Sequence, residues 1–460
     1  MGGTRDLMLS KLKDRIASLE QIADQLMRPF QRFSQKEASS SILLFFATVV
    51  ALVWANSPFS SLYYSFWHTE LSLTIGTFSI SKSLLHWVND GLMAFFFFIV
   101  GLEIKREMLV GDLASFRKAF LPAAAAFGGM LFPALIFFLL NQGTPAVHGW
   151  GIPMATDIAF ALGALAVLGR RIPFGLRIFL SAFAIADDLG AVLVIALFYT
   201  KTISWDYLLI GMMFVGGLAL ANFLWIRRTL VYAILGLGLW VAILGSGVHA
   251  TVAGIVVAMF IPARVKYDTD RFIREIGTPM NEFQCEPSGC GHSVLLNQRH
   301  INAIQSIQLA AHHAETPLQR LEHSLHPWVA FGVVPLFALA NAGLTLSGLN
   351  MPEALVSPLT LGIVMSLLLG KPLGIMLFSY LSVKTGLAAL PAGVRWSHIV
   401  GAGILGGIGF TMSLFIMNLS FTEDILLVHS KLGILASSLF SGILGLAFLS
   451  MTSLRQKDED

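Results

Sequence analysis

Residues 182–198, AFAIADDLGAVLVIALF, are apolar enough to cross a lipid bilayer, yet they carry two adjacent carboxylates, Asp187 and Asp188, near their middle. A charged side chain at the bilayer centre costs about 2.5 to 3.5 kcal/mol on insertion scales, so ionisable residues at that depth mark a functional site by default. Hard cations such as sodium and lithium prefer oxygen ligands. We therefore predict that the two carboxylates bind and release a small cation, and that protons compete for the same oxygens.

The composition indicates a polytopic membrane protein. Of the 460 residues, 55% are hydrophobic and 12% are charged, and the charged share is about half that of a typical soluble domain. The net charge of +3 is small and is spread over many loops, which gives no indication of nucleic-acid binding. The only cysteines, Cys285 and Cys290, exclude a disulfide framework. The charged first 40 residues do not resemble a removable signal peptide.

The apolar segments predict an all-α fold with twelve transmembrane helices. The segments cover residues 41–56, 84–107, 119–140, 147–168, 174–199, 207–225, 229–245, 248–262, 326–344, 358–382, 397–418 and 430–453. The first is short for a span, and the seventh and eighth are separated only by residues 245–248. Lys and Arg gather in alternate loops, and the intervening loops hold only Lys82, Lys201 and Lys431. This alternation predicts that both termini are cytoplasmic.

Four regions lie outside the spans. The tail 1–40 contains an amphipathic stretch, residues 7–33, which we expect either on the inner membrane surface or as a solvated or loop-packed tail. Residues 69–82 alternate apolar and polar side chains and predict a periplasmic β-hairpin, which either pairs with a second copy or folds on its own protein. The remaining two are a cytoplasmic insertion loop at 264–320, which lies within the domain 41–453, and a cytoplasmic tail at 454–460, which follows that domain.

Two of the predicted spans are interrupted near their middle. In the fourth, Pro153 breaks the helix, and Thr156 and Asp157 stand where a second half-helix would begin, as common helix caps do. In the eleventh, three glycines weaken the helix or allow close packing: Gly406, Gly407 and Gly409. Spans 3–5 and 10–12 cross in opposite senses, and interrupted helices in matching positions of inverted repeats are the best sequence indication of a transporter's binding site.

Lys371 is the only basic residue deep inside a predicted span. An unpaired buried ammonium would lose its proton, so Lys371 should face a carboxylate. Neighbouring residues on a helix point about 100° apart, so one of Asp187 and Asp188 should pair with Lys371 while the other faces a water-filled cavity. The carboxylates then titrate as a coupled pair. Alternate exposure of this site to both membrane faces would exchange a cation for protons.

Two other functions use similar residues. An intramembrane aspartyl protease needs its two aspartates on separate helices, facing each other across a water molecule, whereas Asp187 and Asp188 are adjacent. A sodium-coupled symporter of an organic anion would use the same broken helices. It would also need further polar groups for its substrate, and the crossing offers mainly Thr156, Thr411 and Ser413.

Seven sequence stretches resemble the signature stretches of bacterial NhaA-type sodium/proton antiporters, a family that is itself a standard example of the inverted-repeat fold. They are ATDIAFALG, DDLGAVL, SGVHATVAGI, LEHSLHPWVAF, PLFALANAG, GKPLGI and GIGFTMS, and the resemblance covers roughly residues 83 to 453. It implies an electrogenic, pH-regulated inner-membrane antiporter for sodium and pH homeostasis, active as a homodimer. It also implies that Asp188 is the principal cation carboxylate, that Asp187 pairs with Lys371, and that Thr156 and Asp157 lie at the crossing. Protons would be carried either by Lys371 or by the aspartates.

The resemblance also implies pH-responsive groups at the cytoplasmic side, at Glu103, Arg106, Glu107, Glu322, His323 and His326. Each of them alone could equally belong to an ordinary charged helix end. Asp90 and His249 are weaker candidates, since a lone histidine is more often a packing residue than a switch. The long N-terminal tail and the insertion depart from the family pattern. Cys285, Cys290 and His292 do not fit a standard zinc spacing, so we expect a solvated loop there and no structural metal or cofactor.

Overall fold

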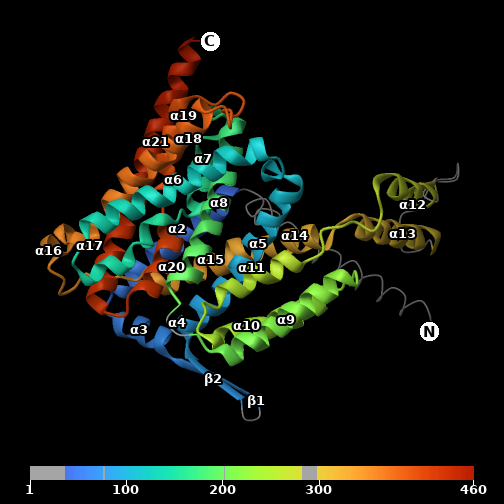
Figure 1. The fold of residues 1–460 in the computed structure, drawn as a ribbon, viewed down its shortest axis with the longest axis horizontal. Coiled ribbons are helices and arrows are strands. Elements are labelled where there is room, and N and C mark those ends of the chain that lie inside the picture. Colours follow the sequence, from blue (N-terminus) through green and yellow to red (C-terminus); the bar gives the residue numbers. More distant parts are fainter. Residues whose placement is uncertain (1–36, 76–77, 201–202, 282–297, 460) are drawn as a thin grey trace, which may run out of the picture. The chain divides into compact units, whose positions relative to one another are not determined.

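A computed structural model describes residues 37–75, 78–200, 203–281 and 298–459. The amphipathic stretch at 7–33, Cys285, Cys290 and His292 therefore lie outside the described residues. The chain divides into two compact units, and Figure 1 labels their helices and strands. Unit 1 contains residues 1–66, 124–187 and 330–460, and unit 2 contains residues 67–123 and 188–329. Two long helices, α6 (Phe116–Leu140) and α8 (Phe174–Phe198), pass from one unit into the other.

Unit 1 is helical. Its other main helices are α2 (Glu37–Ala55), α3 (Ser60–His68), α7 (Ile158–Val167), α15 (Val334–Asn341), α16 (Met351–Val356), α17 (Pro358–Met365), α18 (Lys371–Lys384), α19 (Trp396–Gly406), α20 (Phe410–Ser420) and α21 (Asp424–Glu459). A π-helical turn, η8 (Ser366–Gly370), joins α17 to α18. Helix α21 continues through most of the segment that we expected to be a separate C-terminal tail. Its neighbours in this unit include α17 and α19.

Unit 2 begins with the predicted β-hairpin. Strand β1 (Glu70–Ile75) pairs antiparallel with β2 (Phe78–Ser83), and Leu71 lies opposite Lys82. The helices that follow are α4 (Leu84–His86), the π-helical η1 (Trp87–Leu92), α5 (Met93–Val110), α9 (Trp205–Phe223), α10 (Thr229–Ser246), α11 (Thr251–Phe260) and α14 (Pro317–Trp328). Helix α11 packs against α5. Gly254 permits this contact, because a Cβ there would lie 2.2 Å from the carbonyl oxygen of Ala94.

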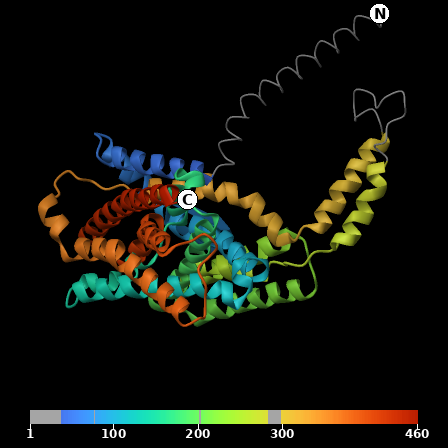
Figure 2. The same ribbon diagram turned by 90° about the horizontal axis from the view of Figure 1, so that it is seen from above.

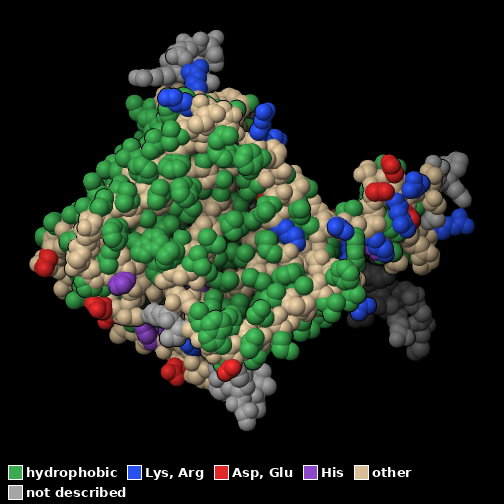
Figure 3. Space-filling view, viewed as in Figure 1, with side chains coloured by type: hydrophobic (Ala, Val, Ile, Leu, Met, Phe, Trp, Pro, Cys, Tyr) green, Lys and Arg blue, Asp and Glu red, His purple; other side chains and the backbone are tan. Residues whose placement is uncertain are grey.

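Eight helices of the described chain are long and apolar enough to cross a membrane, and the number rises to eleven if each of three bent helix pairs is one span. Hydrophobic side chains cover much of the face shown in Figure 3, as a surface in contact with lipid requires. The prediction of twelve spans exceeds this count because α11 has only ten residues. The protein is therefore a multi-pass helical membrane protein with one small two-stranded sheet.

The insertion that we expected to be a loop contains two helices, α12 (Thr269–Asn281) and α13 (Gln298–Ala314), which pack against each other (Figure 2). Helix α12 is amphipathic: Phe272 and Ile276 are half-buried, whereas Arg274 is exposed. Helix α13 buries Ala303 and Ala310. Each helix alone is too polar to resemble a span, and the pair packs together along its apolar side chains.

Candidate functional site

Two helices in unit 1 are interrupted where the sequence predicts. The 3-10 turns that contain Pro153 end at Met154, and α7 begins four residues later at a bend of 44°. Asp157 caps α7, since its carboxylate accepts a hydrogen bond of 3.0 Å from the amide of Phe160. The second break separates α19 from α20 at a bend of 45°. Each break leaves backbone groups inside the protein that need partners.

The two breaks satisfy each other's hydrogen bonds. Thr156 Oγ1 donates to the carbonyl of Gly406 at 2.9 Å, and the amide of Asp157 donates to the carbonyl of Ile408 at 2.6 Å. The Asp157 carboxylate accepts from the amide of Thr411 at 3.0 Å and from its hydroxyl at 2.5 Å. Unit 1 therefore contains a crossing of two broken helices whose polar backbone is shielded from lipid.

Close approach at this crossing requires glycine at position 407. A Cβ at Gly407 would lie 2.6 Å from the carbonyl oxygen of Leu367, which is shorter than any normal carbon–oxygen contact. The glycines of the predicted break thus allow tight packing, and they also occur where the helix stops. From the sequence, these glycines could either weaken the helix or allow close packing. The structure shows a helix break and a close contact at the same place.

Lys371 lies beside the crossing and forms an ion pair with Asp187. Its Nζ is 2.8 Å from Asp187 Oδ2, and both side chains have no solvent exposure. Lys371 also donates a hydrogen bond to the carbonyl of Met154, at the end of the first half of the broken helix. The ring of Phe183 lies 5.9 Å from the ammonium. The pair is thus enclosed by protein, and loss of one partner would strand a buried charge.

Asp188 follows directly on α8 and is also fully buried. The boundary between the two units falls between Asp187 and Asp188. Because successive helix positions point in different directions, the two carboxylates cannot share one set of neighbours. Asp187 forms an ion pair with Lys371 in this structure, and the assignment of the cation to Asp188 stays a prediction.

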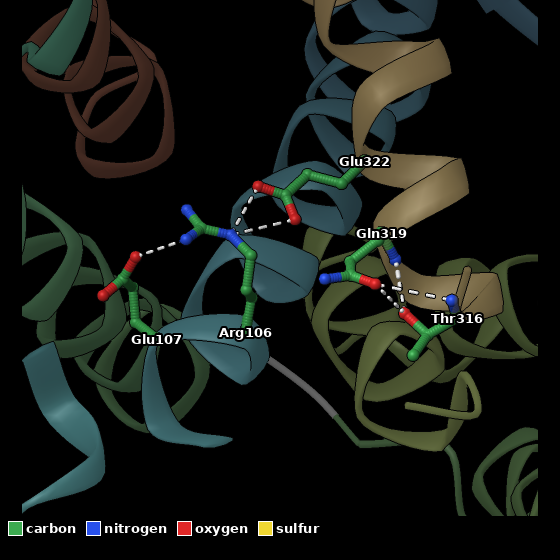
Figure 4. Close-up of polar contacts among 5 residues, drawn as sticks. All are labelled: Arg106, Glu107, Thr316, Gln319 and Glu322. Carbon is green, nitrogen blue, oxygen red and sulfur yellow. Dashed lines mark hydrogen bonds and ion pairs between the residues drawn. The ribbon is translucent and has the colours of Figure 1, made fainter. Parts of the chain in front are cut away.

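A second charged cluster lies in unit 2, between α5 and α14 (Figure 4). Arg106 Nε is 2.9 Å from Glu322 Oε1, and Arg106 Nη1 is 2.7 Å from Glu107 Oε1. Thr316 and Gln319 form a capping box that begins α14 and so positions Glu322. Glu103 is half-buried one turn before Arg106 on α5. The structure thus places all six predicted pH-responsive residues on two helices that pack against each other, α5 and α14.

The two histidines of that predicted set are exposed on α14. His323 and His326 lie on the helix that carries Glu322, and both side chains are exposed at the surface of the molecule. They therefore lie close to Glu322 along the chain, on an exposed part of the same helix. Their proposed role in pH response stays a prediction.

Asp90 and His249, which the sequence suggests only separately, meet in unit 2. His249 Nε2 is 3.7 Å from Asp90 Oδ1, and His249 Nδ1 is 2.8 Å from Thr251 Oγ1. The indole of Trp240 donates a hydrogen bond of 3.1 Å to the Asp90 carbonyl. No sequence pattern links residues 90 and 249, because nothing local records that η1 and the start of α11 adjoin.

Two further residues make specific contacts that the sequence analysis did not predict, although it named Thr411 as a polar group at the crossing. Thr411 is the main hydrogen-bond partner of Asp157, and its position at the start of a half-helix could have signalled this. Lys105 donates to the carbonyls of Met259 at 2.6 Å and Ile261 at 2.5 Å, at the end of α11. A lysine at a helix C-terminus is favourable because it opposes the helix dipole.

A helical membrane protein that encloses carboxylates and an ammonium beside two crossing, interrupted helices has the construction of a secondary transporter of small ions. Residues 31–449 match the family described as Na+/H+ antiporter 1. The chain belongs to this family, and it is a transporter rather than an enzyme. The family implies no cofactor, because Na+ and H+ are the ions transported.

Named relatives agree with this family. The chain is 49% identical over 433 residues to the Na+/H+ antiporter NhaA 2 of Syntrophotalea carbinolica, and the match covers 94% of this chain and 98% of the relative. It is 51% identical over 422 residues to the Na+/H+ antiporter NhaA of Oleidesulfovibrio alaskensis, covering 92% and 93%. A solved structure of a sodium proton antiporter from Methanocaldococcus jannaschii aligns over 97% of this chain and 98% of its own, with a TM-score of 0.46 and 13% identity.

Proposed function

We propose that this chain exchanges Na+ or Li+ for H+ at Asp187, Asp188 and Lys371. The observation that supports the proposal most directly is the fully buried Lys371–Asp187 pair beside the helix crossing. A hard cation binds carboxylate oxygens in their deprotonated form, and protonation removes those ligands. Adjacent carboxylates also repel each other, so the site takes up protons as a coupled group.

Lys371 gives this exchange two possible proton routes. In the first, the aspartates themselves take up the protons that displace the cation. In the second, a cation at the carboxylates weakens the Lys371–Asp187 pair, and the freed ammonium loses its proton. Both routes couple the cation to protons through one set of oxygens, and either one makes exchange electrogenic when protons outnumber cations. Thr156 and Asp157 would hold the crossing in register in both routes.

The remaining features of the proposal concern assembly and regulation. We assign the protein to the bacterial inner membrane, with twelve spans, inverted repeats in spans 3–5 and 10–12, and both termini in the cytoplasm. A homodimer would form through the β1–β2 hairpin, whose two-stranded sheet has open edges. The cluster of Arg106, Glu107 and Glu322, together with the neighbouring Glu103, His323 and His326, would set the pH at which exchange begins.

Everted membrane vesicles test the exchange directly. A pH gradient is first established, and NaCl, LiCl or KCl is then added at a series of pH values with no organic solute present. Dissipation of the pH gradient on addition of Na+ or Li+ supports antiport. The alternative of an organic-anion symporter has no support from the relatives, and it predicts no release under these conditions. A chain that moves no protons with any of these cations would refute the proposed function.

A further inference from the structure

Near the α19–α20 break in unit 1, a backbone carbonyl and a side-chain hydroxyl lie close to Gly407. Each lacks its usual hydrogen-bond partner within the described chain. The carbonyl belongs to Leu367 in the π-helical turn η8. In this turn the amide of Lys371 donates to Ser366, five residues before it. The equivalent donor for Leu367 would be residue 372, which is a proline and has no amide hydrogen. Neither position therefore supplies Leu367 with its usual helical hydrogen bond.

The hydroxyl belongs to Ser441 on α21. Ser441 has no solvent exposure, and its Oγ makes no hydrogen bond to any atom of the described chain. Both oxygens converge on Gly407: a Cβ there would lie 2.5 Å from Ser441 Oγ and 2.6 Å from the Leu367 carbonyl oxygen. The two oxygens are therefore at most about 5.1 Å apart, a separation that a single water beside Gly407 can bridge with hydrogen bonds of about 2.8 Å.

We propose that Ser441 and the Leu367 carbonyl bind one water molecule at the α19–α20 break, and that Ser441 is thereby a positioning residue for ion exchange. A buried water normally makes about three hydrogen bonds to polar groups that lack partners. Here it donates to Leu367 and pairs with Ser441, one turn of helix from Lys371. It keeps the polar backbone of the break satisfied while the pair of Lys371 and Asp187 opens and closes. This inference rests on the exchange proposed above.

Dry packing is the alternative explanation. Small residues recur along one side of α21, and they let this helix pack closely against α17, η8 and α19. These residues are Ser430, Gly433, Ser437, Ser441 and Gly445. If the hydroxyl of Ser441 were dry and unsatisfied, its removal would stabilise the protein. The two explanations therefore predict opposite effects of Ser441→Ala.

The test uses the full chain in proteoliposomes and measures Na+-driven proton flux. Ser441→Ala should lower the maximal rate about tenfold, the effect of one hydrogen bond in the rate-limiting state. The KM for Na+ should stay within about twofold, because the site carboxylates are intact. Ser441→Thr, which keeps a hydroxyl, should recover most of the rate. Ser437→Ala is the matched control, since Ser437 is equally buried but donates to Ile434 at 3.1 Å.

Several outcomes would overturn the inference. One is a Ser441→Ala protein with the wild-type rate and a raised melting temperature, and another is an equal loss of rate in Ser437→Ala. Absence of exchange in the wild-type chain would instead refute the proposed function itself. Radiolytic hydroxyl labelling of the wild-type protein gives an answer even if Ser441→Ala does not fold. Leu367 should be labelled well above Ile363, which is equally buried, and equal labelling would contradict a bound water.

Discussion

The two charged clusters of this molecule use the same chemical groups in different surroundings. In unit 1, Lys371 and Asp187 pair with no solvent exposure. In unit 2, the side chain of Arg106 is 35% exposed and its partners Glu107 and Glu322 are 14% and 15% exposed. A buried pair leaves an uncompensated charge when one partner is lost, whereas solvent can partly replace a partner at a pair that is partly exposed. Burial, rather than charge, therefore decides which cluster the fold depends on.

The backbone differs in the same way. In unit 1 the helices beside Lys371 are broken, and each break depends on donors and acceptors from the other. In unit 2, Glu322 lies on a helix that begins with its own capping box, and Arg106 lies within α5. A change in unit 1 should therefore disturb both transport and stability, and a change in the unit 2 cluster should mainly alter regulation.

The largest expected effect is that of Asp188→Asn. An amide keeps the size of the side chain but cannot carry the negative charge that attracts a cation, and it cannot exchange a proton. Na+-driven proton flux in everted vesicles should fall to the level of vesicles without the protein. Asp206→Asn, a change of the same kind at an exposed position on α9, should leave the flux unchanged. Appreciable flux in the Asp188→Asn protein would mean that oxygens other than those of Asp188 bind the cation.

Lys371→Ala should cause the largest loss of stability. It strands the fully buried carboxylate of Asp187, and breaking a buried pair costs about 3 to 5 kcal/mol. The melting temperature of the purified protein should fall clearly below that of Lys384→Ala, which removes an exposed lysine from the same helix. The double variant Lys371→Met, Asp187→Asn should recover part of the loss. Equal melting temperatures for Lys371→Ala and Lys384→Ala would contradict the importance of the pair.

The contacts that could be predicted from the sequence are those of polar residues inside the apolar segments, because lipid offers such residues no hydrogen-bond partners. An ammonium inside a span must have a carboxylate partner, so the contact of Lys371 with an aspartate followed from the chain alone. The breaks at Pro153 and at Gly407 followed from the poor helical character of proline and glycine. By contrast, the meeting of Asp90 with His249 depends on how distant helices pack, and no local pattern records it. Length and apolarity likewise could not distinguish the ten-residue α11 from a full span.

A smaller effect is expected for Arg106→Gln. The pair is partly exposed, so the loss of stability should be at most about 1 kcal/mol. If the cluster sets the pH threshold, the pH of half-maximal exchange should shift while the maximal rate persists. Arg274→Gln, at an exposed position on α12, is the control and should shift neither quantity. If Arg106→Gln lost as much stability as Lys371→Ala, the fold would depend on both clusters alike, contrary to what their difference in burial predicts.

The smallest effect concerns the α12–α13 hairpin at its junction with α14. Partial burial and the nearby Arg320 lower the pKa of His312, and partial burial and Lys266 lower the pKa of His313. The folded hairpin therefore binds fewer protons than the unfolded chain as the pH falls below the ordinary histidine pKa of about 6.5. The stability of this junction should be complete above that pH and should decline below it.

Amide hydrogen exchange measures this junction locally. Exchange in α13, corrected for the intrinsic effect of pH, should become faster relative to α21 between neutral and mildly acidic pH. Replacement of both histidines by glutamine removes the titrating groups and should flatten this dependence. His312 and His313 lie at the surface of unit 2. The backbone amides around Lys371 and Asp187 in unit 1 should therefore show no matching change in hydrogen exchange. A pH dependence that survives the double replacement would assign the effect to other groups.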